Sequence, residues 1–178
     1  IYLEEHPNAN IHVIDSLSAG GEVDLLVRKL NHLVAEGLDF DQVLDAITAY
    51  RAKTKLLFVL AKVDNLVKNG RLSKLVGTVV GLLNIRMVGE ASKTGTLELL
   101  QKARGQKKAI KAAFDELIKA GYTGGHITIA HRNNDKFIEQ FSELVREKFA
   151  QASIEVLPTS GLCSFYAEEG GLLMGYEI

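Results

Sequence analysis

The sequence predicts an α/β protein in two parts: the remainder of a layered α/β lobe over residues 1–62, and a lobe with a mixed β-sheet and helices packed on it over residues 63–178. Two observations favour this class. Short apolar, β-branched runs of strand length alternate with longer stretches in which apolar residues recur every three or four positions, as in amphipathic helices. No internal repeat or low-complexity linker interrupts the pattern, and we place the lobe boundary near residues 61–64.

The first part is expected to run strand, helix, helix, strand. Residues 11–14 form a mostly β-branched run that is typical of a buried strand. One helix follows Gly20-Gly21 and ends near Gly37, and a second begins after Asp39, whose carboxylate can cap it. Residues 55–60 are a continuous apolar run, which suits a strand in a sheet that is covered on both faces.

The second part is expected to form a mixed sheet with its helices on one face. A short helix over residues 63–68 precedes a hairpin, whose strands at 85–90 and 96–100 flank Lys93-Thr94-Gly95. Amphipathic helices are expected at 102–119 and from Asn134 or Asp135 to Phe149. The other expected strands are 126–131, 154–157 and 171–176.

Composition and charge exclude several classes of protein. The 178 residues carry a net charge of −1, so no overall positive field points to nucleic acid. No apolar run approaches the ~18–20 residues needed to cross a bilayer, and the start of the chain is unlike a signal peptide. The single cysteine, Cys163, excludes an intrachain disulfide and a cysteine-rich metal site. We expect a cytoplasmic protein with no metal and no cofactor.

The most informative stretch runs from Lys68 to Asn84. A turn precedes Arg71, and Ser73 is placed to cap an apolar helix. The free N–H groups and the dipole of that helix favour an anion beside Arg71, while Gly77 and Gly81 leave one helix face without side chains. A cation at one end of an apolar surface suits a ligand with a charged head and a hydrocarbon tail. The alternative is a packed core helix with Arg71 in an ordinary salt bridge.

Other residues could carry chemistry. Cys163 with His126 or His131 could serve as nucleophile and base in a small-molecule hydrolase or transferase, although a buried, inert cysteine is more common and a turn histidine such as His131 usually caps backbone groups. Glu168-Glu169 could bind a cation or act as acid and base, but adjacent side chains rarely converge, so a solvated turn is favoured. Five cations near the start of the helix at 102–119 could bind phosphate or dock an acidic partner: Lys102, Arg104, Lys107, Lys108 and Lys111.

Five stretches, in order along the chain, resemble the DegV family of fatty-acid-binding proteins: residues 13–21, 66–74, 82–86, 103–109 and 129–131. The most specific is Gly-Arg-Leu-Ser-Lys at 70–74, followed by the apolar helix and Leu-Asn-Ile. Members of the family are longer and this chain starts with Ile1, so the resemblance implies a C-terminal fragment that lacks roughly the first third. Family loops that supply hydroxyls to the ligand would precede Ile1, so we expect weak binding by the fragment alone.

The resemblance implies a carrier and not a catalyst. Such a protein binds a long-chain fatty acid between two lobes and presents the carboxylate to a partner fatty acid kinase, which forms an acyl phosphate for phospholipid synthesis; transient contact with a membrane surface fits this role. The family's carboxylate-site arginine corresponds to Arg71, and Tyr166 stands where many members have a histidine. Ser73 is assigned to the same site, and the expected acyl wall is Leu75, Val76, Val79 and Leu83. A regulatory protein-interaction domain, docking through the basic residues at 102–111, is the remaining alternative.

Overall fold

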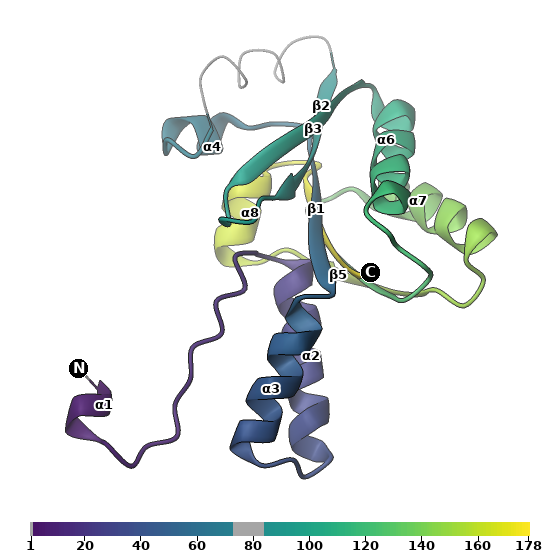
Figure 1. Cartoon of the computed structure of the whole chain (residues 1–178). Coiled ribbons are helices and arrows are strands. Elements are labelled where there is room, and N and C mark those ends of the chain that lie inside the picture. The colour runs from purple at the N-terminus through teal and green to yellow at the C-terminus, as the bar shows by residue number, and fades with distance from the viewer. Residues whose placement is uncertain (1, 73–83) are drawn as a thin grey trace.

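A six-stranded mixed sheet forms the centre of the protein (Figure 1). The computed structural model describes residues 2–72 and 84–178. The strand order is β3-β2-β1-β6-β4-β5. Strands β4 and β5 pair in parallel and the other neighbours pair antiparallel, so the predicted mixed sheet is confirmed. The strands are β1 (Thr54–Leu60), β2 (Ile85–Ala91), β3 (Leu97–Arg104), β4 (His126–His131), β5 (Ser153–Pro158) and β6 (Leu172–Glu177).

The helices lie on both faces of the sheet, whereas we expected them on one. They are α1 (Tyr2–Glu5), α2 (Gly21–Ala35), α3 (Phe40–Arg51), α4 (Asp64–Lys68), α6 (Gln106–Lys119), α7 (Asp135–Lys148) and α8 (Gly161–Ala167). Helices α6 and α7 cover one face (Figure 1), and α2, α4 and α8 lie on the other, with α3 packed on α2. Within the described ranges, none of these helices has the length and apolar character needed to cross a membrane.

Strand β1 is apolar on both faces because it lies in the middle of the sheet. Leu57 and Val59 belong to the core beneath α6 and α7, whereas Phe58 and Leu60 pack with α4 and α8. Since successive side chains of a strand point to opposite faces, one apolar run supplies two cores. The prediction that residues 55–60 form a strand covered on both sides is therefore confirmed.

Helix α2 approaches the sheet through two glycines. A Cβ atom on Gly21 would lie 2.1 Å from the Thr128 carbonyl oxygen, and a Cβ atom on Gly175 would lie 2.2 Å from the Glu22 backbone nitrogen. Residues without side chains are needed for two backbones to approach this closely. The Thr54 hydroxyl, which donates to the Glu22 carboxylate at 2.8 Å, adds a buried hydrogen bond between the helix and β1.

Two of the predicted secondary-structure elements are wrong. Residues 11–14 were expected to form a buried strand but have no regular structure, and Val13 is 82% exposed. No strand in the described part of the chain lies beside them to pair their backbone groups. The helix expected from residue 102 begins at Gln106, because β3 continues to Arg104 and pairs there with Ile85. Helix α8 was not expected at all.

The predicted lobe boundary between residues 62 and 63 passes through the sheet. Strand β1 lies before this boundary and the other five strands follow it. Because β1 pairs with β6 on one side and β2 on the other, it lies inside the six-stranded sheet. Hydrogen bonding between strands therefore joins residues on both sides of this boundary.

Candidate functional site

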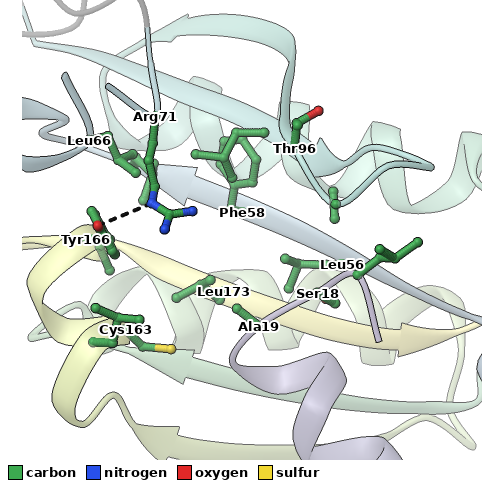
Figure 2. Close-up of a pocket in the computed structure, with 17 residues that line it drawn as sticks. Ser18, Ala19, Leu56, Phe58, Leu66, Arg71, Thr96, Cys163, Tyr166 and Leu173 are labelled. Atoms are coloured by element: carbon green, nitrogen blue, oxygen red, sulfur yellow. Dashed lines mark hydrogen bonds between the residues drawn. The ribbon is translucent and has the colours of Figure 1, made fainter. Parts of the chain in front are cut away.

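An apolar cavity of about 290 Å³ lies on the face of the sheet that carries α4 and α8 (Figure 2). Strand β1 supplies one wall through Leu56, Phe58 and Leu60, three side chains that alternate onto this face. Leu173 of β6 continues this wall. The remaining walls come from α4 and α8, from the loop at residues 17–19 and from the turn between β2 and β3.

Arg71 and Tyr166 form a polar group at one side of the cavity (Figure 2). The Arg71 Nε atom donates to the Tyr166 phenol oxygen at 3.2 Å, and the guanidinium carbon lies 5.4 Å from the centre of the phenol ring. This arrangement combines a hydrogen bond with a cation–π contact. Nε is the only guanidinium nitrogen that bonds to another described residue, so the planar end of the group can form paired hydrogen bonds with a carboxylate.

The end of α4 fixes the backbone position of Arg71. The Gly70 N–H donates to the Val67 carbonyl at 3.1 Å, and the Arg71 N–H donates to the Leu66 carbonyl at 2.8 Å. This pair of bonds is the Schellman motif, in which the residue after the helix adopts a left-handed conformation that favours glycine. Gly70 has a φ of 68°. The turn expected before Arg71 is confirmed, and it places the arginine next to the cavity.

Polar bonds join α8 to α4. The Glu168 carboxylate accepts from the Asn65 backbone N–H at 2.9 Å, and the Asn65 side chain donates to the Phe165 carbonyl at 2.8 Å. These bonds connect the helix that carries the phenol to the helix that precedes the arginine. Glu169 instead accepts from the Asn133 side chain at 3.1 Å in an exposed position. Glu169 is exposed, as expected for a solvated turn, whereas Glu168 is half-buried and bonds to α4.

Cys163 lines the cavity, but none of the described lining residues is a histidine. His131 Nδ1 accepts from the Asn134 backbone N–H at 3.2 Å, as expected for a histidine that caps a turn. His126 Nε2 lies 3.9 Å from a carboxylate oxygen of Glu155. Over residues 2–72 and 84–178, no group of three or more histidine, cysteine and acidic side chains could hold a metal ion. This geometry gives no support to a cysteine nucleophile with a histidine base.

The five basic residues expected on one helix are divided between two elements. Lys102 and Arg104 lie on β3, and the three lysines at 107, 108 and 111 lie on α6. All five are exposed, and Lys111 bonds to Asp115 at 2.7 Å. We call these five residues the basic cluster. It lies at the end of the sheet where β1 also ends, because Arg104 pairs with Ile85 next to the β1–β2 ladder.

The structure brings together two of the predicted fatty-acid-binding residues, Arg71 and Tyr166. The other five, Ser73, Leu75, Val76, Val79 and Leu83, lie outside the described residues. Several cavity residues were not identified from the sequence: Leu17, Ala19, Leu56, Phe58, Leu66 and Leu173. The alternation on β1 could have indicated Leu56 and Phe58. The loop at 17–19 lies in a stretch that resembles the family, but its residues do not by themselves indicate a cavity wall, because only the fold brings them to the cavity.

The chain matches a known family and its curated members. A family model described as "Uncharacterised protein, DegV family" matches residues 1–176. The DegV domain-containing protein of Streptococcus gordonii is 76% identical over 178 residues, which are 100% of this chain and 63% of that protein. A DegV domain-containing protein of Streptococcus pyogenes serotype M1 is 67% identical over 176 residues, 99% of this chain and 63% of that protein. The chain therefore spans less than two thirds of these relatives.

Two solved structures are similar in fold and sequence. The Streptococcus pneumoniae Fatty Acid Kinase (Fak) B3 protein loaded with linoleic acid has a TM-score of 0.97 and 76% identity, and the match covers 99% of this chain and 63% of that chain. A DegV family protein from Eubacterium eligens loaded with heptadecanoic acid has a TM-score of 0.93 and 38% identity, with 99% and 64% covered.

Proposed function

Since this chain belongs to the DegV family, we propose that it forms part of a site for a long-chain fatty acid. The observation that carries the proposal is the contact between Arg71 and Tyr166 at one side of an apolar cavity. A carboxylate that is withdrawn from water needs charged or hydrogen-bonding partners, because an unpaired buried charge is very costly. An acyl chain gains free energy from burial roughly in proportion to its length.

Arg71 and Tyr166 have complementary roles in this proposal. The guanidinium supplies the positive charge and a planar pair of N–H donors for the carboxylate. The phenol oxygen already accepts from Arg71 Nε, so its own O–H remains available to donate to a carboxylate oxygen. Two similar proteins are described with linoleic acid and heptadecanoic acid, which supports a straight-chain fatty acid as the ligand class.

In the intact protein we place this site between two lobes, of which this chain supplies one wall. The residues of the predicted acyl wall would extend the apolar surface beyond the described cavity: Leu75, Val76, Val79 and Leu83. Ser73 would stand beside Arg71 at the head group. In this arrangement the protein is a carrier, and the chemistry of the bound carboxylate is left to a partner enzyme.

We assign that partner to a fatty acid kinase, which would phosphorylate the presented carboxylate. The name of the pneumococcal relative supports this assignment. The basic cluster fits the docking surface, because it is exposed at the end of the sheet where β1 leads into α4 and Arg71. Reversing two charges in Lys107→Glu/Lys108→Glu should lower kinase-coupled phosphorylation and leave fatty-acid affinity unchanged. Unaltered phosphorylation would exclude docking through this cluster.

Native mass spectrometry of the intact protein tests the binding function. The unaltered protein should carry the added mass of a fatty acid, and Arg71→Ala should lose it while retaining a folded charge-state distribution. Lys68→Ala is the matched control, since Lys68 is an exposed cation on α4 that does not line the cavity. Equal ligand occupancy in Arg71→Ala and Lys68→Ala would overturn the proposed role of Arg71.

A further inference from the structure

The cavity has a polar end and an apolar end, and β1 gives its direction. Leu60 and Leu56 both line it, four residues apart, so this wall is roughly 13 Å long at ~3.3 Å per residue. Leu60 is the end of β1 that leads into α4 and Arg71. Figure 2 shows Arg71 and Tyr166 at one side, and Leu56 at the other together with Ser18 of the loop at 17–19.

A second cavity, of about 720 Å³, adjoins the first at this far end. Leu17, Leu56 and Ala91 line both cavities. The second is bordered by charged and hydroxyl side chains, among them the buried Glu22 and Thr54 and the half-buried Arg51. The boundary between an apolar and a polar cavity is therefore only one layer of side chains thick.

Leu17 is held at this boundary by its own loop. Its backbone has a φ of 52°, in the left-handed region that a leucine rarely adopts. Its N–H donates to the Asp15 carboxylate at 3.0 Å, and the next N–H, that of Ser18, donates to the Ser16 hydroxyl at 3.2 Å. These local side-chain bonds favour a turn over an extended chain.

The β2–β3 turn supports Leu17 from the other side. A Cβ atom on Gly95 would lie 3.3 Å from the Leu17 Cα atom, so the two turns are in direct backbone contact. The Ser92 hydroxyl accepts from the backbone N–H groups of Thr94 at 3.2 Å and Thr96 at 3.1 Å, which organises this turn. Leu17 therefore belongs to one turn and packs against another, and side chains within each turn set its conformation.

We propose that Leu17 sets the length of acyl chain that the protein prefers. It closes the apolar cavity at the end opposite the head group and separates it from the polar cavity. Methylene groups up to Leu17 are buried against apolar walls, and each contributes roughly fourfold in affinity. Methylene groups beyond Leu17 would meet the polar surroundings of Glu22 and Thr54 and gain little. This inference rests on the proposed fatty-acid function.

The test is calorimetry of the intact protein with straight-chain saturated fatty acids that increase by two carbons. For the unaltered protein, affinity should rise along the series and then reach a plateau. Leu17→Ala should move the plateau to a longer acid, because two further carbons can fill the space of the removed leucine side chain, with a gain of roughly tenfold for the first acid beyond the original plateau. Leu17→Phe should move it to a shorter acid. The shortest acid, which does not reach Leu17, should bind all three proteins alike and shows that the variants are folded.

Leu162→Ala is the control variant, because Leu162 lines the same cavity from α8 but not the polar cavity. It should leave the plateau where it is. A plateau that stays at one length in both Leu17 variants would overturn the inference while the proposed function stands. A protein that binds none of the acids would instead reject the proposed function.

Discussion

The two faces of the sheet bury similar side chains but differ in what covers them. On one face α6 and α7 complete a continuous core, in which Phe137, Phe141 and Val145 have no exposed surface. On the other face the covering helices and loops leave a cavity over Phe58 and its neighbours on β1. Strand β1 serves both faces with the same kinds of residue. The covering elements, and not the strand, decide whether an apolar surface becomes a packed core or a ligand site.

The largest loss of unfolding free energy should come from removing a buried ring on the packed face. Phe141→Ala removes a fully buried ring that stacks on Phe137, with ring centres 6.0 Å apart. We expect the free energy of unfolding to fall by about 3–5 kcal/mol, because the packed neighbours can move only partly into the cavity that the ring leaves. Urea denaturation of the intact protein measures this loss, and fatty-acid affinity of the folded protein should hardly change. A loss below about 1 kcal/mol would show that this face is as loosely packed as the other.

A smaller loss of unfolding free energy should come from removing a hydrogen bond between the helices on the cavity face. Glu168→Ala removes the acceptor for the Asn65 N–H, so α8 loses one of its bonds to α4. We expect a loss of roughly 1 kcal/mol in unfolding free energy, discounted because Glu168 is half-buried. Fatty-acid affinity should fall by roughly fivefold, since the phenol of Tyr166 no longer lies correctly against Arg71.

Two variants separate this positioning role from a general loss of stability. Glu168→Gln keeps an oxygen acceptor and should restore most of the affinity. Glu169→Ala removes a neighbouring carboxylate that bonds to Asn133 and not to α4, and it should bind as the unaltered protein does. Equal affinities in Glu168→Ala and Glu169→Ala would show that the bond to α4 does not position the site.

The smallest effect at neutral pH should come from Tyr176→Phe on the packed face. Tyr176 has no exposed surface, and within the described residues its hydroxyl has no hydrogen-bond partner. Removing that hydroxyl should therefore change the unfolding free energy by no more than about 1 kcal/mol, in the stabilising direction.

The same variant should differ more at alkaline pH. Burial raises the pKa of Tyr176 above its ordinary value, and the nearby Glu90, Glu22 and Glu116 add to the shift. Folding therefore favours the neutral phenol. The contribution of Tyr176 to the unfolding free energy is complete below about pH 10 and is lost as the pH rises further. Denaturation at several pH values should show a growing advantage for Tyr176→Phe above about pH 10. If the difference in unfolding free energy between the two proteins stayed constant with pH, folding would not raise the pKa of Tyr176.

Elements with strong local signals could be predicted from the sequence. Asp39 was expected to cap a helix, and its carboxylate accepts from the Gln42 N–H at 2.9 Å while Gln42 bonds back in a capping box. The hairpin around Gly95 and the strand at residues 126–131 were also expected, and β2, β3 and β4 confirm them. In each case the residues that specify the element lie within it.

The errors arise where a distant segment decides the outcome. Residues 11–14 have the composition of a strand, but a strand also needs a partner for its backbone groups. Lys102 and Arg104 favoured a helix by composition, yet pairing with β2 keeps them extended. Arg71 and Tyr166 were linked by a family resemblance and not by their spacing. Leu17 could not be identified, because its place between two cavities depends on the packing of separate loops.

The central claim is that Arg71 recognises the head group of an acyl ligand at the cavity. The most direct measurement is calorimetry of the intact protein and of Arg71→Ala with a long-chain fatty acid and with the fatty alcohol of the same length. Loss of Arg71 should weaken binding of the acid by roughly 10- to 100-fold, the value of charge-assisted hydrogen bonds of about 1.5–3 kcal/mol, and should hardly alter binding of the alcohol. Unchanged affinity for the acid in Arg71→Ala would contradict the claim.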